Sequence, residues 1–231
     1  MIQLVVLLAL SWLLIWFFEK KHLSVLGLIP TKRILLWSSI LLLVSALIAA
    51  TAFVLRSWII QEAYILNPAA SAHSVLMNTW YQFRTVFTEE LLCRGALLYI
   101  LIQRIGSKKS ILVTAFLFAV LHLLNAGIWG DGVQLILVFL FTFIMGLLLA
   151  FAFVKSGSLL TPLAIHFGWN WVQNYAFPES ATGSHLFILS APAPVVTISY
   201  LAFFTMMFLP KVLVLLVDYG IIRIYPKAPA S

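Results

Sequence analysis

The chain has 231 residues, of which 63% are hydrophobic and 9% are charged, and its mean hydropathy is +1.09. Soluble domains are about 45–50% apolar and about 25% charged, so this composition excludes a soluble globular domain. The single cysteine, Cys93, excludes an intramolecular disulfide and a cysteine-rich zinc site. The net charge of +7 arises from basic residues scattered in pairs between apolar runs, which is typical of membrane loops and not of a nucleic-acid interface. The sequence therefore predicts an all-α polytopic membrane protein that binds no nucleic acid.

The apolar runs predict one integral membrane domain over residues 1–231, because a bilayer core of about 30 Å needs roughly 20 apolar residues per helix. Seven runs meet this requirement approximately: 2–18, 34–55, 82–105, 111–128, 133–154, 159–177 and 195–217. The first lacks a basic leader and a small-residue cleavage site, so we expect a retained span. The last is interrupted by Pro210 and Lys211. The stretch 56–81 is too polar to be predicted as a membrane span. We expect a lipid-surface helix or a partly re-entrant segment there, and the chain would have eight spans if this stretch crossed the membrane.

In a seven-span arrangement most loop cations fall on one side of the membrane. They are Lys20, Lys21, Lys32, Arg33, Arg104, Lys108, Lys109, Lys155, Arg223 and Lys227. The opposite loops hold Arg56, Glu62, Asp131 and Glu179. The positive-inside rule then predicts an outside N-terminus and a cytoplasmic C-terminus, in the plasma membrane if the source is bacterial. An eighth span would spoil this charge bias, which favours seven.

Three of the predicted spans carry ionisable or amide groups, which are costly inside a bilayer and mark functional sites by default. In the third span Glu90 and Arg94 are four residues apart, so they share a helix face as an ion pair. The neighbouring Glu89 points about 100° away and has no partner in its own segment. A carboxyl group in this position is a candidate general base or acid. The alternative is an inert, solvated cluster at the end of a helix.

The fourth and sixth spans supply two histidines and an amide. His122 lies one turn after Phe118, and His166 lies one turn before Asn170. A lone intramembrane histidine is more often a packing residue than a catalyst, and His166 with Asn170 also suits an interhelical hydrogen-bond pair. Counted from the basic loops at about 1.5 Å per residue, however, His166, His122 and Glu89 lie at similar depths of roughly 14, 18 and 20 Å. We therefore expect them to converge in one intramembrane cavity, where a hydrolase-like set can activate water and stabilise an oxyanion.

Three motifs, in this order on three apolar helices, resemble the signature of the CPBP family, the CAAX proteases and bacteriocin-processing enzymes also called Abi. The family pattern is E-E-x-x-x-R, F-x-x-x-H and H-x-x-x-N. This chain has Glu89-Glu90-x-x-x-Arg94, Phe118-x-x-x-His122 and His166-x-x-x-Asn170. The resemblance covers about residues 82–175, and the motif-bearing core is 82–177. Cys93 stands where an aromatic residue is common in the family.

The resemblance implies an intramembrane endopeptidase that acts on a prenylated CAAX-type or other membrane-anchored protein or peptide. Carried onto this chain, Glu89 and His122 activate water, while His166 and Asn170 stabilise the oxyanion. Glu90 and Arg94 form a structural pair, and Phe118 supports the site. The family has also been described as metalloproteases, and Glu89, His122 and His166 are the three ligands that zinc would use. The chain has no H-E-x-x-H motif, so we favour a glutamate mechanism without a cofactor.

Two other classes of function compete with the endopeptidase. One is a non-catalytic scaffold or bacteriocin-immunity protein of the same fold, which retains the polar cluster for packing. The other is a transporter that relays protons through the Glu and His groups, which the absence of a visible internal repeat disfavours.

Overall fold

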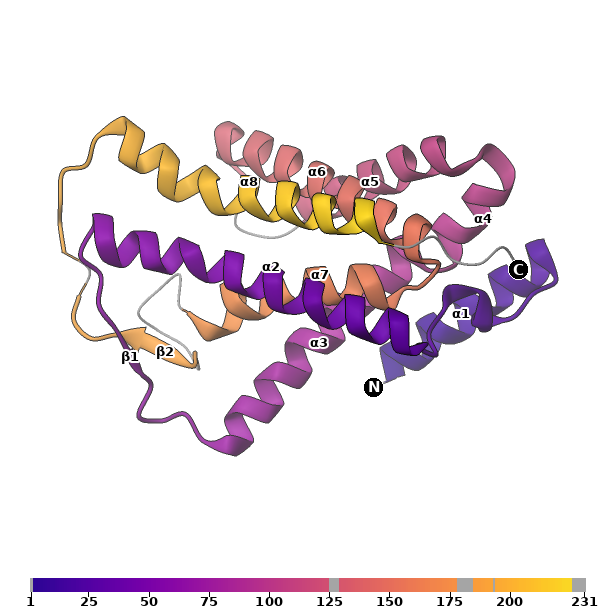
Figure 1. Cartoon of the computed structure of the whole chain (residues 1–231), viewed down its shortest axis with the longest axis horizontal. Coiled ribbons are helices and arrows are strands. Elements are labelled where there is room, and N and C mark those ends of the chain that lie inside the picture. The colour runs from indigo at the N-terminus through magenta and orange to yellow at the C-terminus, as the bar shows by residue number, and fades with distance from the viewer. Residues whose placement is uncertain (1, 125–128, 178–184, 193, 226–231) are drawn as a thin grey trace.

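A computed structural model describes residues 2–124, 129–177, 185–192 and 194–225, and it shows an elongated bundle of helices with a small two-stranded sheet at one end (Figure 1). The α-helices are α1 (Ile2–Glu19), α2 (Lys32–Ile59), α3 (Ala72–Arg94), α4 (Ala96–Ile105), α5 (Ser107–Leu123), α6 (Gly132–Ser156), α7 (Leu160–Trp171) and α8 (Tyr200–Ile224). The short elements are the 3₁₀ helix η1 (Leu23–Leu26), the π-helix η2 (Val172–Ala176) and the strands β1 (Tyr64–Leu66) and β2 (Phe187–Leu189). The predicted all-α membrane bundle is thus confirmed.

Among the described residues, four helices are long and apolar enough to cross a membrane: α1, α2, α6 and α8. They correspond to the predicted runs 2–18, 34–55, 133–154 and 195–217. The expected interruption of the last run was wrong, since α8 continues through Pro210. A proline removes only one backbone donor, and the packing of α8 against α2 and α6 keeps this helix continuous. The predicted run 111–128 forms α5, and its last four residues lie outside the described part of the chain.

The predicted third span, 82–105, is not one helix. It is divided at Gly95 into the end of α3 and the separate helix α4. A Cβ atom at Gly95 would lie 2.2 Å from the carbonyl oxygen of Leu91, so the backbone conformation at this break requires a residue without a side chain. The divided helix places Glu89, Glu90 and Arg94 in the last turn and a half of α3, immediately before the bend.

The stretch 56–81 does not form one element of its own, and its position relative to the membrane stays a prediction. Its first residues complete α2, its last residues begin α3, and β1 lies between them. Strand β1 pairs antiparallel with β2, with Tyr64 opposite Leu189. Arg56, at the end of α2, forms a bidentate ion pair with the buried Glu62. The connection is extended, and its polar groups have partners in α2 and in a loop that is distant in the sequence.

Four of the helices begin at a side chain that accepts a backbone hydrogen bond. Thr31 caps α2, Ser71 caps α3 in a capping box, Asp131 caps α6 and Ser199 caps α8. The cap side chain satisfies a backbone donor that has no partner inside the helix. These residues explain why three of the four candidate spans start where they do.

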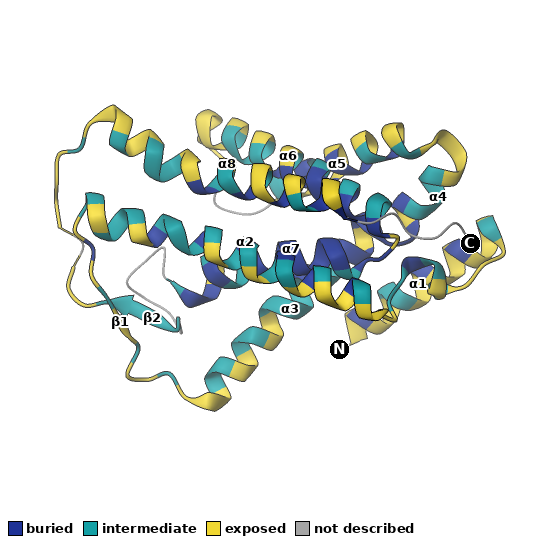
Figure 2. Ribbon diagram, in the orientation of Figure 1, coloured by how far each residue is buried: buried dark blue, intermediate teal, exposed yellow. Residues whose placement is uncertain are grey.

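Helix α7 lies at the centre of the bundle, packed against α2, α3 and α6. Eight of its 12 residues are buried, and Figure 2 shows buried residues concentrated where these helices meet. Gly168 makes the close approach to α2 possible, because a Cβ atom there would lie 2.4 Å from the carbonyl oxygen of Leu42. The central position of α7 allows side chains on it to meet groups from several other helices.

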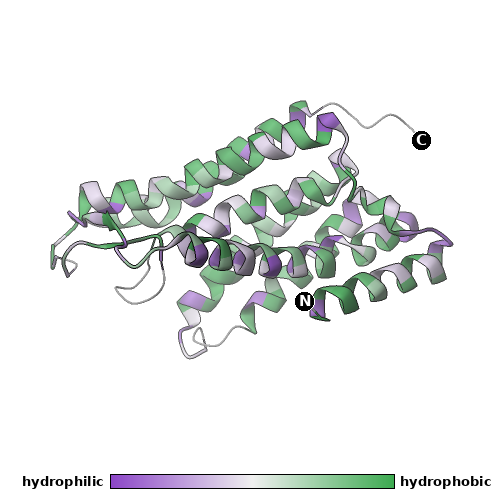
Figure 3. Cartoon of the chain, turned by 90° about the horizontal axis from the view of Figure 1, so that it is seen from below, coloured by the Kyte–Doolittle hydropathy of each residue, from purple (hydrophilic) through white to green (hydrophobic). Residues whose placement is uncertain are grey.

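The basic loops gather at one end of the bundle. The α1–α2 and α4–α5 connections and the end of α8 lie together (Figure 1), and hydrophilic residues mark the same end in Figure 3. Of the charged residues used to predict orientation, Lys227 and Glu179 lie outside the described residues. The direction in which the bundle crosses the membrane stays a prediction.

Candidate active site

The buried centre of the site is the ion pair of Glu90 and Arg94. Both side chains are fully buried, and Arg94 Nη1 donates to Glu90 Oε1 over 3.0 Å. Arg94 Nη2 also donates to the carbonyl oxygen of Gly146 on α6, at 3.4 Å. A buried charge is tolerated only when it is paired and hydrogen-bonded. The pair therefore neutralises itself inside the bundle and connects α3 to α6.

His166 connects α7 to the same carboxylate. Its Nδ1 atom lies 2.8 Å from Glu90 Oε1, and since the carboxylate paired with Arg94 is an acceptor, Nδ1 carries the proton and donates. Its Nε2 atom faces Asn170 Nδ2 at 3.2 Å and Glu89 Oε2 at 3.6 Å. One imidazole thus joins the structural carboxylate on one edge to Glu89 and Asn170 on the other.

Phe118 lies at the point where the three motifs meet. The Arg94 guanidinium carbon is 4.0 Å from the centre of its ring, a cation–π contact. The His122 and His166 rings contact it edge-on, with centroid distances of 4.3 and 5.6 Å. The single phenyl ring therefore orients one functional group from each of α3, α5 and α7.

Glu89 and His122 face a common cavity of about 180 Å³. The other lining residues are Leu92, Cys93, Phe118 and Leu121. The Glu89 side chain keeps a third of its surface exposed, and its buried Oε2 atom has no hydrogen-bond partner among the described residues. His122 Nδ1 lies 2.8 Å from the Phe118 carbonyl oxygen, which only accepts, so Nδ1 carries the proton. In the neutral ring Nε2 then remains as an acceptor.

The structure brings all seven candidate residues together: Glu89, Glu90, Arg94, Phe118, His122, His166 and Asn170. It does not arrange the three candidate zinc ligands as a metal site. Within the described residues no three His, Cys, Asp or Glu side chains are grouped to hold a metal ion. His166 has a carboxylate at one ring nitrogen and an amide at the other, and the choice between a mechanism without a cofactor and one with zinc stays a prediction.

Sequence reasoning missed two features of this site. It paired His166 with Asn170 alone and did not link it to Glu90, because a contact between residues 76 positions apart depends on the packing of α7 against α3. It also treated Phe118 as general support. The only signal for its role was its spacing of one turn before His122.

Chemically, the site has two parts. Two hydrogen-bond acceptors face the cavity, and a network of hydrogen-bonded side chains lies behind them. Glu89 Oε2 and His122 Nε2 are suited to hold and deprotonate a water molecule. Asn170 retains an N–H group beyond its contact with His166, which suits it to stabilise developing negative charge. The ion pair of Glu90 and Arg94 fixes the position of His166.

Residues 70–172 match a family described as Type II CAAX prenyl endopeptidase Rce1-like. The matched segment contains all three motifs and every residue of the site, and it confirms the resemblance predicted from the sequence. No curated protein and no solved structure matches the chain.

Proposed function

We propose, from the similarity of residues 70–172 to the Rce1-like family of type II CAAX prenyl endopeptidases, that Glu89 is the general base of peptide-bond hydrolysis. The observation that carries the proposal is the unsatisfied Oε2 atom of Glu89, which lies at a cavity shared with His122 and 3.6 Å from His166 Nε2. A carboxylate that is partly open to a cavity has the freedom that a base needs. Glu90, by contrast, is held by Arg94 and His166 and lacks this freedom.

The reaction begins with a water molecule between Glu89 and His122. His122 accepts one hydrogen bond from this water through Nε2, while Glu89 removes its other proton as the oxygen attacks the scissile carbonyl carbon. The proton held by Glu89 then passes to the leaving amine as the carbon–nitrogen bond breaks. General-base catalysis of this kind contributes about 10²–10⁴-fold to the rate.

Asn170 and His166 act on the opposite side of the reacting carbonyl. Asn170 donates its remaining N–H group to the oxyanion. His166 positions Asn170 by accepting a hydrogen bond from its amide at Nε2, while Nδ1 donates to the Glu90 carboxylate. Removal of one oxyanion donor typically costs about 10²–10³-fold in kcat, so Asn170→Ala is expected to reduce kcat within this range.

The substrate class that fits best is a prenylated protein with a CAAX-type C-terminus, from which the last three residues are removed. An apolar groove of about 260 Å³ lies between α2, α3 and α7, and Leu163 and Phe167 of α7, the helix that carries His166, line it. A bound isoprenoid chain would leave water for such a groove at about 25 cal/mol for each Å² of apolar surface buried. The groove therefore supports a lipid-modified substrate.

The test compares wild type, Glu89→Gln and Glu19→Gln on a fluorogenic prenylated peptide and on its unprenylated counterpart. Glu89→Gln keeps the shape of the side chain and removes the base, so we expect a loss of about 10²–10⁴-fold in kcat. Glu19→Gln makes the same change at the basic end of the bundle and is expected to retain activity. Equal rates for wild type and Glu89→Gln would contradict the proposal, and an absence of cleavage would favour the scaffold alternative.

A further inference from the structure

The cavity beside Glu89 has an inner wall and an outer rim. Cys93 of α3 and Phe118 of α5 are each 2% exposed and form the inner wall. Leu92 and Leu121, on the same two helices, are 47% and 39% exposed and form the rim. The cavity therefore begins at the surface of the bundle between α3 and α5 and ends inside it.

The surface at which the cavity opens faces lipid. Every exposed residue from Leu112 to Leu124, along α5 and its C-terminal cap, has a large hydrophobic side chain. Soluble surfaces rarely carry so long an apolar stretch, which marks contact with a membrane or a partner. In a chain whose described residues include four helices long enough to cross a bilayer, that contact is with lipid. The rim of the cavity therefore opens toward the hydrocarbon of the membrane and not toward water.

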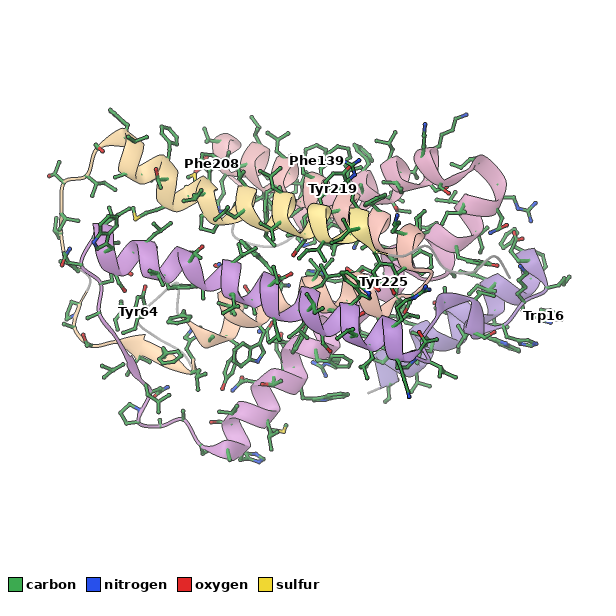
Figure 4. The ribbon with its side chains drawn as sticks, viewed as in Figure 1. Trp16, Tyr64, Phe139, Phe208, Tyr219 and Tyr225 are labelled. Carbon is green, nitrogen blue, oxygen red and sulfur yellow. The ribbon has the colours of Figure 1, made fainter. Side chains whose placement is uncertain are left out.

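Helix α5 is held in place by its packing on α6. Phe116 contacts the ring of Phe139 edge-on, with a centroid distance of 5.9 Å (Phe139 is labelled in Figure 4). Gly146 of α6 lies so close to α5 that a Cβ atom there would be 3.0 Å from Ala115 Cα. The entrance between α3 and α5 is therefore bounded on one side by a helix that the rest of the bundle fixes.

The volume of the cavity limits what it can hold. An apolar cavity of about 150 Å³ accommodates one benzene molecule, and a water molecule occupies about 30 Å³. A cavity of about 180 Å³ therefore has room for the water of the proposed mechanism and for one group of about six carbon atoms. Apart from Glu89 and His122 the lining is apolar, so this group is apolar as well. An isoprenoid chain is far too large for the same space.

We propose that this cavity binds the side chain of the residue that follows the scissile bond and that Cys93 sets the largest side chain accepted. The substrate enters the cavity from the lipid, between Leu92 and Leu121. This inference rests on the proposed function and names the selectivity of its site. The residue before the scissile bond is the prenylated cysteine of the substrate, whose side chain does not fit, so the side chain in the cavity belongs to the residue after the bond.

Cys93 is the specificity-determining residue because it has the smallest side chain of the lining and stands on the inner wall. Each carbon atom added at this position takes volume from the group that the cavity binds. A small aliphatic side chain such as that of valine fits the cavity of the wild-type chain, whereas the indole of tryptophan exceeds it.

The test uses the full chain in phosphatidylcholine nanodiscs and farnesylated peptides that differ only in the residue after the prenylated cysteine, which is alanine, valine or tryptophan. Wild type gives kcat/KM for cleavage, and Glu89→Gln gives the affinity for the uncleaved peptide. Both should favour valine over tryptophan by about 10–200-fold, the usual effect of a group of the wrong size in an apolar pocket. Cys93→Leu should move the preference from valine to alanine, while Cys93→Ser, which barely changes the volume, should keep the wild-type order.

The entrance is tested by a bulky side chain on the rim. Leu121→Trp should lower kcat/KM for every peptide by about tenfold or more without changing their order, since association rates differ by about one to three decades among variants of one binding site. Leu117→Trp is the matched control, because Leu117 lies one turn earlier on α5, is 38% exposed and does not line the cavity. It should leave kcat/KM unchanged.

Equal values for valine and tryptophan would overturn the inference, and so would a size order that Cys93→Leu leaves unchanged. Equal effects of Leu121→Trp and Leu117→Trp would overturn the assigned entrance. The wild-type size order and the rim comparison are decisive even where a Cys93 variant does not fold. Size-selective binding that depends on Cys93, without cleavage by wild type, refutes the proposed function and supports the inference, whereas cleavage without size selectivity refutes only the inference.

Discussion

Glu89 and Glu90 are adjacent in sequence but have opposite environments. Glu90 is enclosed by Arg94 and His166, while Glu89 reaches a cavity. The i, i+4 spacing on α3 was sufficient to predict which carboxylate pairs with Arg94, because this contact is local. The link from His166 to Glu90 was not predictable, since it depends on how α7 packs against α3.

Glu90→Gln is expected to destabilise the protein, whereas Glu89→Gln is not. Removing one partner of a buried ion pair typically costs about 3–5 kcal/mol, because Arg94 would be left buried without its counter-charge. The measurement is the thermal unfolding midpoint of each variant in detergent, together with its purified yield. A Glu90→Gln protein with the midpoint of wild type would show that the ion pair does not have the structural role assigned to it.

Phe118→Leu tests whether one ring positions the three motifs. The leucine keeps an apolar side chain but removes the face against Arg94 and the edges against His122 and His166. A buried cation–π contact is worth about 2 kcal/mol, so we expect a lower unfolding midpoint and at least tenfold lower kcat. Phe116→Leu, an exposed position on α5, is the matched control. A variant with unchanged kcat would contradict the positioning role.

At the scale of elements, hydropathy predicted the long spans well and the short helices poorly. The helices α1, α2, α6 and α8 follow from apolar runs alone. The division at Gly95 was missed because the apolar run continues on both sides of this residue. The need for a glycine there becomes visible only in the folded chain, where a Cβ atom at this position would clash with Leu91. The pairing of β1 with β2 joins segments more than 120 residues apart, which no local pattern reveals.

Gly168→Ala tests the close packing of α7 on α2. The new methyl group would meet a backbone oxygen at 2.4 Å, and a backbone atom cannot move as a flexible side chain can. Overpacking of this kind costs about 1–3 kcal/mol, and displacement of α7 would also move His166 and Asn170. We therefore expect both the unfolding midpoint and kcat to fall. Gly132→Ala, where no atom lies within 4 Å, should leave both unchanged.

The connection between α2 and β1 should make stability depend on acid pH. Burial alone raises the pKa of Glu62, but the hydrogen bonds from Arg56 and Tyr64 outweigh this effect and hold the pKa below its ordinary value of 4.5. A lowered pKa in the folded state adds stability that is complete above the unfolded value and is lost as the pH falls through the folded one. Below about pH 4.5 the unfolding midpoint of wild type should therefore fall more steeply than that of Glu62→Gln. Parallel curves for the two proteins would contradict this role of the ion pair.

At the scale of the whole molecule, the gathering of basic loops at one end predicts how the bundle crosses the membrane. Electrostatic orientation requires this end to face the cytoplasm. The chain is suited to a cysteine test, because its single native cysteine, Cys93, is buried. Reporter cysteines at two exposed residues, Ala69 in the β1–α3 connection and Lys108 at the start of α5, would report the two faces, because these segments lie near opposite ends of the bundle (Figure 1).

In intact bacterial cells a membrane-impermeant maleimide should label Ala69→Cys and should reach Lys108→Cys only after permeabilisation. The wild-type chain is the control for background labelling at Cys93. The reverse pattern would place the basic end outside and would show that loop charge does not orient this protein. The expected orientation places the basic end toward the cytoplasm, and His166 then lies six residues from the beginning of α7. A substrate anchored in the cytoplasmic leaflet would then have to bring its C-terminus into the bundle, which requires an extended, apolar C-terminal segment.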